Sequence, residues 1–405
     1  MKTPQTPLKK PEFVALMAMS FATIAFSIDA MLPALPEIGA ALTPDDLNRA
    51  QLILTSFVLG MGLGTFFTGP LSDTFGRRRV LLGGFVIYMI ASVLAMLAGS
   101  LEMVLAARVL QGIGAAGPRV VAMAVIRDRY AGRQMAQLMS FVMIVFTLVP
   151  AFAPALGAVI IAFVGWRGLF GAFVIFAVIN GLWFGLRQPE TLAKDSRRAF
   201  SVPVLWSGTV EVLTNRTVRV TILVQTLLLG ALFSMLSTTQ QVFDITFDQG
   251  DNFPLWFGGL ALIAGTAGLL NAALVVRLGM RLLIRTTLLV QIIISGSIAT
   301  MLLLNIMPDW AYFVSFLIWM TSIFFMTGMT LGNLNAIAME PMGHMAGIAA
   351  SVVSSISTVL AVVIAAPVGY AFDGTPLPVL IGVFCCAVLA LAFMQLIRQE
   401  PLPAE

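Results

Sequence analysis

The chain has 405 residues, of which 59% are hydrophobic and only 10% are charged, and its formal net charge is +4. A soluble protein carries roughly a quarter charged residues, so this composition excludes a soluble globular protein. The basic residues recur in short clusters between apolar runs. That pattern is typical of a chain that crosses a lipid bilayer, and it argues against nucleic acid as a partner.

Apolar runs long enough to cross a bilayer as helices follow one another along the chain. We expect about twelve, at residues 13–35, 50–70, 79–99, 102–126, 136–161, 166–187, 218–240, 254–276, 282–304, 310–335, 346–370 and 377–397. The longest polar stretch, 188–217, separates the sixth run from the seventh. The sequence therefore predicts an all-α membrane protein with an N-terminal six-helix half at 1–187, a cytoplasmic linker at 188–217 and a pseudo-symmetric C-terminal half at 218–405.

The charges predict how the chain is oriented. With the N-terminus in the cytoplasm, the arginines of 77–79, 127–133 and 277–285 fall inside, while Asp45, Asp251 and Asp309 fall outside. Lys and Arg concentrate on the cytoplasmic side of membrane proteins. We therefore expect a multi-pass membrane protein with both termini in the cytoplasm. We further expect a monomer in the bacterial inner membrane.

No feature of the chain calls for a metal or another cofactor. Cys385 and Cys386 are adjacent in an apolar run, and His344 is the only histidine. Adjacent cysteines are poorly placed for a disulfide, and no ligand cluster accompanies the histidine. The chain also lacks a Gly-x-x-x-x-Gly-Lys loop and a nucleophile–base pair, which disfavours an ATP-driven pump and a membrane enzyme.

Ionisable side chains inside the expected spans are few, chiefly Asp29, Arg108 and Arg119. Such residues are costly in hydrocarbon, so a functional role is the default interpretation. Asp29 lies near the outer end of the first span, and Arg108 lies at a similar depth in the fourth. The two could pair, which predicts a proton-coupling site; a purely structural ion pair is the alternative.

The fourth span carries a stripe of polar and small residues. Arg108 and Arg119 are separated by about 20° around the helix and roughly 16 Å along it, and Gln111 and Ala115 lie near the same face. We expect this face to line a water-filled cavity. Arg119 has no acidic residue at its own depth, so we expect it to bind an anionic group of the substrate, with a backbone carbonyl as the alternative partner.

Other uncharged residues are weaker candidates for the cavity. We expect Met31, Gln240, Gln241 and Asn333 to contribute to substrate binding. Hydrogen bonding between helices, without any ligand, is an equally good explanation for the amides.

The loop after the second span combines two glycines with opposite charges. Gly69 and Gly76 allow close approach and a sharp turn, and Arg77 can bind the carboxylate of Asp73. Asp128, at the end of the fourth span, falls on the same side of the membrane. We expect these residues to form a cytoplasmic cluster that stabilises one conformational state.

The fifth span contains two prolines, Pro150 and Pro154. Proline kinks a membrane helix and leaves backbone carbonyls without their usual donors. The prolines therefore predict a helix that moves during gating; a static bend is the alternative.

Several of these patterns resemble those of a known family. Residues 69–81 resemble motif A of the major facilitator superfamily, and 108–117 resemble its motif B. With Asp29-Ala-Met-Leu-Pro33, Ile126-Arg-Asp128 and Pro189-Glu-Thr-Leu192, the chain resembles the Bcr/CflA branch of the drug:proton antiporter-1 family. Two departures are Ala273, where an acidic residue would repeat motif A, and Ala153, where the antiporter-associated motif C has glycine.

The resemblance implies the major facilitator fold and proton-driven export by alternating access. We therefore expect a proton-coupled efflux transporter of small molecules such as drugs, in which Asp29 exchanges protons and Arg108 favours the charged carboxylate. The alternative is a transporter dedicated to one organic anion or metabolite, anchored by Arg119.

Overall fold

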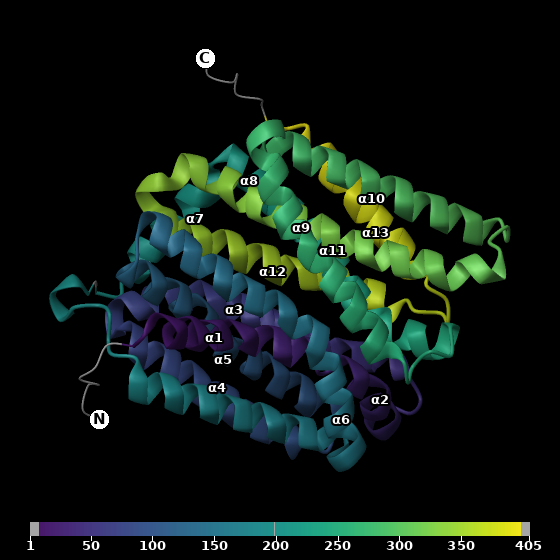
Figure 1. Cartoon of the computed structure of the whole chain (residues 1–405), viewed down its shortest axis with the longest axis horizontal. Coiled ribbons are helices and arrows are strands. Elements are labelled where there is room, and N and C mark those ends of the chain that lie inside the picture. Colours follow the sequence, from purple (N-terminus) through teal and green to yellow (C-terminus); the bar gives the residue numbers. More distant parts are fainter. Residues whose placement is uncertain (1–7, 198, 398–405) are drawn as a thin grey trace.

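The structure, a computed structural model, describes residues 8–197 and 199–397. These residues form helices and connecting loops, with no strand among them. The N-terminal half contains α1 (Lys10–Asp29), α2 (Leu35–Leu42), α3 (Leu52–Phe75), α4 (Arg77–Met96), α5 (Leu101–Arg129) and α6 (Gly132–Arg187). The C-terminal half contains α8 (Arg216–Gln241), α9 (Phe253–Leu278), α10 (Met280–Leu303), α11 (Asp309–Met339), α12 (Ala346–Tyr370) and α13 (Leu377–Met394). Figure 1 shows the two halves side by side, with α3 packed against α12 and α6 against α9 where they meet.

The number of membrane crossings agrees with the expectation from sequence. Ten helical stretches in the described part of the chain are long and apolar enough to cross a membrane. Two of them, Gly132–Arg187 with 56 residues and Asp309–Tyr370 with 62, exceed twice the roughly 20 residues that one crossing needs. The first turns at Gly165, whose φ is +66°, and the second is divided by the turn Glu340–Met345. Each accounts for two crossings, which gives the twelve-helix fold.

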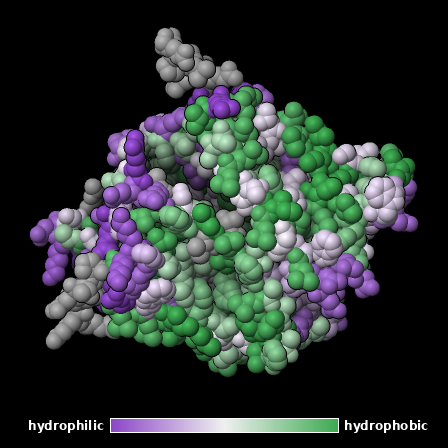
Figure 2. Space-filling view, viewed as in Figure 1, coloured by the Kyte–Doolittle hydropathy of each residue, from purple (hydrophilic) through white to green (hydrophobic). Residues whose placement is uncertain are grey.

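The outer surface of the bundle is apolar. Figure 2 shows hydrophobic residues across the middle of one face and hydrophilic residues gathered towards its ends. Exposed side chains such as Phe163, Leu269 and Val276, at 84%, 73% and 88%, would be unfavourable in water. A bilayer is the solvent in which this surface is stable.

Close helix packing fixes the position of the candidate site. A Cβ at Gly60 of α3 would overlap the main chain at Val109, and a Cβ at Gly112 of α5 would overlap the carbonyl of Phe57. These two glycines let α3 and α5 touch along their backbones. The first turns of α5, which carry Arg108, are therefore held deep in the N-terminal half.

The polar stretch between the halves is more ordered than its composition indicates. It contains the helix α7 (Val202–Thr214), whose Leu205, Gly208 and Val212 are buried. A Cβ at Gly208 would lie 3.1 Å from Ile348 of α12, so α7 packs on the C-terminal half. Its opposite side exposes Trp206 at 69%.

Candidate functional site

The helix α1 does not continue unbroken through the whole first apolar stretch, Lys10–Leu42. It ends at Asp29, and the chain continues through a short turn at Leu32–Ala34 into α2. Pro33 and Pro36 have no N–H, so they cannot donate to the carbonyls one turn earlier. The N–H of Met31 donates to the carbonyl of Ile28, 3.2 Å away, which leaves the Ser27 carbonyl without its usual helical donor.

Asp29 is the carboxylate at this break. Only 5% of the residue is exposed, and the described residues offer it no hydrogen bond or ion pair. A buried charge without a partner is strongly unfavourable, so the carboxyl group is stable here when it carries a proton. Asp29 is therefore the buried carboxyl that the sequence predicts as the proton-exchanging group, and it has no partner among the described residues.

Arg108 is fully buried, and its guanidinium is satisfied by other partners than Asp29. Its Nη2 donates to the Ser27 carbonyl at 3.1 Å, its Nε to the Ile53 carbonyl at 3.2 Å, and its Nη1 to Gln111 Oε1 at 2.6 Å. The guanidinium carbon also lies 4.4 Å from the centre of the Phe57 ring. The ion pair between Arg108 and Asp29 that the sequence suggested is therefore absent, because the free carbonyl of Ser27 binds the guanidinium instead.

A hydrogen-bonded network surrounds this arginine and joins α1, α4 and α5. The Ser27 hydroxyl lies 2.6 Å from the Tyr88 hydroxyl, and the Ser92 hydroxyl donates to the Tyr88 carbonyl at 2.8 Å. Gln111 Nε2 donates to Ser92 Oγ at 2.7 Å. Since both polar ends of Gln111 bind protein groups, its expected role in substrate binding is not visible in this conformation. We call Ser27, Tyr88, Ser92, Arg108 and Gln111 the arginine network.

Arg119 lies further along α5, directly after Pro118. It is half-buried, and no hydrogen bond or ion pair to another described residue holds its guanidinium. Ala115, one turn earlier, is fully buried, as is Met31 beyond the break in α1. Of these three residues expected to bind the substrate, only Arg119 has a polar side-chain group, and that group has no partner among the described residues.

The amides expected in the cavity have different surroundings. Asn333 is 5% exposed and donates to Asn271 Oδ1 and to the Met329 carbonyl, both at 2.8 Å. Gln240 is also 5% exposed, and its Oε1 has no partner among the described residues. Gln240 therefore keeps a polar atom for a ligand, whereas the donors of Asn333 are used within the C-terminal half.

Gln241 belongs to a polar contact between the halves, which differs from its expected place in the substrate cavity. Its Oε1 accepts a hydrogen bond from Gln51, and its Nε2 donates to Asn48 Oδ1 at 3.4 Å. Asn48 also donates to the carbonyls of Tyr370 at 3.1 Å and Phe372 at 2.8 Å. Residues 48 and 51 precede α3, whereas 241 and 370 are the last residues of α8 and α12, and 372 follows α12. We call these five residues the outer closure, because they tie the halves together at the end of the bundle that the charge pattern predicts to face outside.

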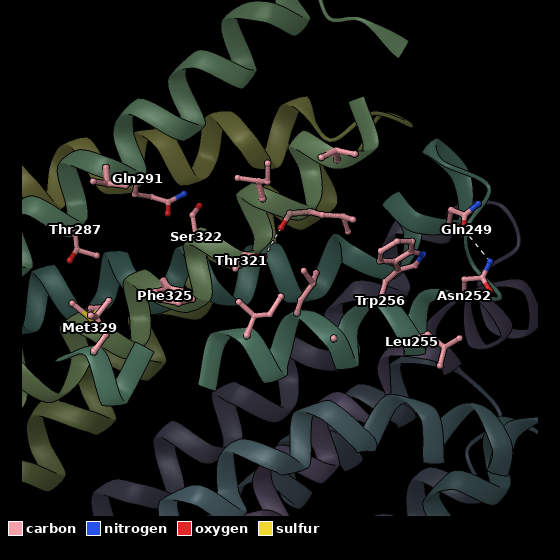
Figure 3. A pocket seen from close by; sticks show the side chains of 18 of the residues that line it. Gln249, Asn252, Leu255, Trp256, Thr287, Gln291, Thr321, Ser322, Phe325 and Met329 are labelled. Carbon is pink, nitrogen blue, oxygen red and sulfur yellow. Dashed lines mark hydrogen bonds between the residues drawn. The ribbon is translucent and has the colours of Figure 1, made fainter. Parts of the chain in front are cut away.

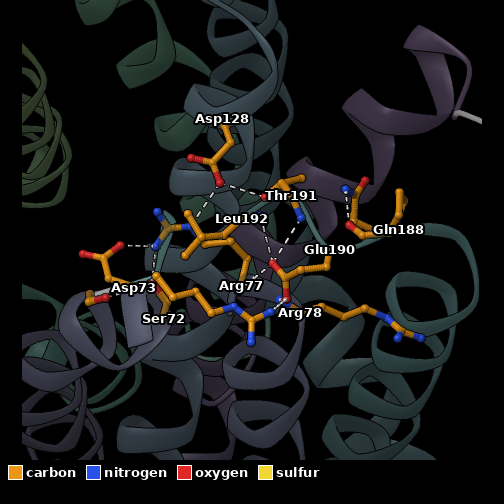
Figure 4. Close-up of polar contacts among 12 residues, drawn as sticks. Ser72, Asp73, Arg77, Arg78, Asp128, Gln188, Glu190, Thr191 and Leu192 are labelled. Atoms are coloured by element: carbon orange, nitrogen blue, oxygen red, sulfur yellow. Dashed lines mark hydrogen bonds and ion pairs between the residues drawn. The ribbon is translucent and has the colours of Figure 1, made fainter. Parts of the chain in front are cut away.

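The charged cluster at the opposite end is centred on Arg77. Its Nη1 lies 2.5 Å from Asp73 Oδ1 and 2.6 Å from Ser72 Oγ, and its Nε donates to Asp128 Oδ2 at 3.1 Å. Figure 4 shows Arg77 between the two carboxylates. Gly76 makes this possible with a φ of +96°, which ends α3 and starts α4 within one residue. Asp73, Gly76, Arg77 and Asp128 are thus brought together.

The polar linker contributes a third carboxylate to this cluster. Glu190 accepts hydrogen bonds from the backbone N–H groups of Arg77 at 2.9 Å and Arg78 at 3.2 Å, at the N-terminus of α4. A carboxylate is favourable there, because the first N–H groups of a helix lack partners within the helix. The Thr191 hydroxyl donates to Asp128 at 2.7 Å. The linker therefore binds both the main chain at Arg77 and the carboxylate of Asp128.

Two helices of the N-terminal half touch the C-terminal half closely. A Cβ at Gly69 of α3 would lie 3.0 Å from Ser351 of α12, so this motif glycine lies against the opposite half. On α6, which carries Pro150 and Pro154, the carbonyl of Ala151 lies 2.6 Å from where Gly258 of α9 would place a Cβ. Contacts this close cannot persist unchanged if one half rotates against the other.

The comparison with known families identifies the fold. The model of the Major Facilitator Superfamily matches residues 16–366. The chain belongs to the major facilitator superfamily. Residues 69–81, which resemble motif A of this superfamily, form the end of α3, the bend at Gly76 and the start of α4.

Three relatives are similar in sequence to this chain. An uncharacterised major facilitator-type transporter of Bacillus subtilis, YdgK, is 28% identical over 92% of both chains. A bicyclomycin resistance protein homolog of Haemophilus influenzae is 25% identical over 94% of this chain and 95% of its own. A chloramphenicol resistance protein of Pseudomonas aeruginosa is 39% identical over 36% of this chain and 35% of its own. These names agree with the expected Bcr/CflA resemblance.

Solved structures support the fold alone, because their sequences are distant. The xylose transporter XylE of E. coli, in a partially occluded inward-open conformation, superposes with a TM-score of 0.76 at 15% identity, covering 96% of this chain and 98% of its own. The human organic anion transporter MFSD10 superposes with a TM-score of 0.61 at 16% identity, with coverage of 96% and 98%.

Several site residues could not be expected from the sequence alone. Ser27 binds through its main-chain carbonyl, which no side-chain pattern reveals, although the Pro33–Pro36 spacing does indicate a break in α1. Glu190 reaches Arg77 across 113 sequence positions. The only signal for Glu190 was its place in the Pro-Glu-Thr-Leu pattern of the superfamily branch.

Proposed function

We propose that this transporter exports small molecules from the cytoplasm in exchange for protons. The observation that carries the proposal is Asp29, a buried carboxyl at the broken end of α1 with no partner among the described residues. Proton release would create an unpaired charge in an apolar site, which disfavours that packing and drives a conformational change. Coupling then requires only that the two protonation states favour different conformations.

Arg108 acts in this proposal by holding the end of α1 in place. It binds the Ser27 carbonyl two residues before Asp29. If α1 moves, this hydrogen bond must break or Arg108 must move with the helix. A deprotonated Asp29 would attract the guanidinium, which stands at the same end of α1. We propose that the arginine network is rearranged each time the proton is exchanged.

The two ends of the bundle supply the gates. The outer closure holds the halves together outside, so release of the compound requires its hydrogen bonds to break. The motif A cluster, with the Gly69–Ser351 contact beside it, lies at the cytoplasmic end. We propose that these two sites set the balance between outward-closed and outward-open conformations, with 188–217 as the linker between the halves.

The substrate class follows from the relatives and from Arg119. Two relatives are named for resistance to bicyclomycin and chloramphenicol, which favours uncharged or weakly polar drugs. Arg119 supports the second candidate, a dedicated carrier of one organic anion, because its charge is permanent and uncommitted. We propose the drug exporter as the primary function, in the inner membrane, as a monomer with cytoplasmic termini.

Reconstituted protein tests the proposal. In proteoliposomes with an acidic lumen, chloramphenicol should accumulate inside against its gradient, and a protonophore should abolish the accumulation. Addition of the compound should also raise the luminal pH as protons leave. If a gradient of an organic anion drove the accumulation instead, and the protonophore had no effect on it, the result would favour the anion carrier and contradict proton exchange.

A further inference from the structure

A large cavity in the described part of the protein lies away from the candidate site, between α9, α10 and α11. Its volume is about 1190 Å³, above the usual range of about 300–1,000 Å³ for small-molecule pockets. Figure 3 shows α9 on one side and the helices that carry Gln291 and Ser322 on the other. None of the residues to which we assign proton exchange or gating lines it.

The cavity opens towards lipid. Its rim includes Leu255, Ile263, Val290 and Ile318, which are exposed at 74%, 53%, 53% and 55%. These side chains belong to membrane-crossing helices, so a bilayer would cover them. A molecule that reaches this cavity must first dissolve in hydrocarbon.

The cavity spans much of the membrane. The lining of α11 runs from Val314 to Met329, which corresponds to roughly 22 Å along the helix. Gln249, Asn252 and Trp256 lie at the outer end, where amides and tryptophan are favoured at a membrane surface. The remainder is apolar apart from a few hydroxyl groups and one amide.

The hydroxyl groups do not contribute free donors. Thr287 donates to the Leu283 carbonyl at 2.7 Å, Thr321 to the Leu317 carbonyl at 2.8 Å, and Ser322 to the Trp319 carbonyl at 2.7 Å. Each bond lies within its own helix. A ligand therefore meets mainly methyl and methylene groups at these positions.

Gln291 is the one amide in the apolar part of the cavity lining, and unlike the hydroxyl groups it keeps a polar atom without a partner in the described part of the chain. It is 1% exposed, and its Nε2 donates to Ser295 Oγ at 3.0 Å, which also accepts from Trp319 Nε1 at 3.0 Å. Its Oε1 is buried and has no partner among the described residues. An unpaired acceptor in an apolar site costs free energy that a ligand donor recovers.

We propose that this cavity binds a lipophilic small molecule that carries one hydrogen-bond donor, which Gln291 Oε1 accepts. A phospholipid acyl chain fits the apolar lining, but it has no donor at the depth of Gln291. The single buried acceptor therefore favours an alcohol-like molecule over a lipid chain. The site is separate from the proposed proton exchange and does not depend on it.

The glycines of α9 provide a matched pair of variants. A Cβ at Gly259 or at Gly268 would meet no atom within 4 Å, so both positions accept a side chain without a clash. Gly259 lines the cavity, and Gly268 does not. Gly259→Phe should fill the cavity, whereas Gly268→Phe adds the same ring to the same helix outside it.

The test is photolabelling of the full-length protein in nanodiscs with a diazirine-bearing octanol and with its methyl ether, which lacks the donor. Peptides from α9–α11 should be labelled about fivefold more by the alcohol, the factor expected for one hydrogen bond. Gln291→Leu should remove this preference, Gly259→Phe should reduce labelling by both probes, and Gly268→Phe should change neither.

Two results would overturn the proposal. Equal labelling by the alcohol and the ether would mean that the cavity holds only hydrocarbon, such as a lipid chain. An alcohol preference that survives Gln291→Leu would place the acceptor elsewhere. Because labelling needs no proton gradient, Asp29→Asn should leave it unchanged, which separates this test from that of the proposed function.

Discussion

The guanidinium of Arg108 donates a hydrogen bond to the main-chain carbonyl of Ser27, 3.1 Å away and two residues before the end of α1. The same guanidinium binds Gln111 Oε1 at 2.6 Å and the Ile53 carbonyl at 3.2 Å. One side chain thus connects α1, α3 and α5 next to Asp29. A change in the charge of Asp29 would therefore act first on the hydrogen bonds of Arg108.

Arg108→Lys should reduce transport at least about tenfold and lower thermal stability by several degrees. Lysine keeps the charge, but its compact ammonium cannot reproduce the three-way fork, and each buried acceptor left unpaired costs about 1–3 kcal/mol. Transport in proteoliposomes and the melting temperature in detergent measure both effects. Arg187→Lys is the matched control, because Arg187 binds Glu12 at a half-exposed pair that contributes little. Similar losses in both variants would show that Arg108 has no special role.

Asp73→Asn should lower turnover far more than binding affinity. Asp73 lies 2.5 Å from Arg77 in the motif A cluster, remote from Asp29 and Arg119, so its loss shifts the conformational balance and leaves the binding surface intact. Saturated transport rates and equilibrium binding of a transported compound separate the two quantities. A collapse of affinity with a normal saturated rate would contradict the gating role.

Asn48→Leu should open the outer end more often. The substitution removes donors to the carbonyls of Tyr370 and Phe372, and each lost hydrogen bond shifts the balance by about 1 kcal/mol. We expect at least about fivefold faster labelling of Met31→Cys by an impermeant maleimide added outside. The background should carry Cys385→Ala and Cys386→Ala.

Asn252→Leu is the control for this experiment. Asn252 is also an outer-surface asparagine, but it donates to Gln249 within its own half, 3.1 Å away. Labelling of Met31→Cys should keep its original rate in that variant. Equal acceleration by both substitutions would mean that Asn48 does not hold the halves together.

Arg119→Ala should distinguish the two substrate classes. If Arg119 anchors an anion, binding of anionic ligands should weaken at least about tenfold, or 1.4 kcal/mol, while neutral ligands lose much less. Arg119→Lys should restore part of the affinity, since lysine keeps the charge without the fork. Thermal-shift titrations with cationic, neutral and anionic compounds measure the differences. Equal losses for all three classes would make Arg119 a structural residue.

The fold was predictable from sequence because hydrocarbon permits few solutions. Apolar runs must become helices, and the basic loops set their orientation, so the twelve crossings followed from composition and spacing, whereas motif A followed from the resemblance to the superfamily. The partners of buried polar groups did not follow. The sequence places Asp29 and Arg108 at a similar depth, yet the guanidinium binds the Ser27 carbonyl, which is free because the Met31 N–H donates to Ile28 instead. Gln241 lies in the outer closure because its partners, Asn48 and Gln51, come from the other half of the chain.

Proton release coupled to transport, compared between the wild type and Asp29→Asn, tests the central claim most directly. Asparagine keeps the shape of the side chain but cannot exchange a proton. In proteoliposomes with an acidic lumen that contains a pH-sensitive dye, the wild type should raise the luminal pH when chloramphenicol is added. Asp29→Asn should catalyse exchange of labelled for unlabelled chloramphenicol without any change in luminal pH, which also shows that it is folded. A pH change in Asp29→Asn equal to that of the wild type would contradict the account.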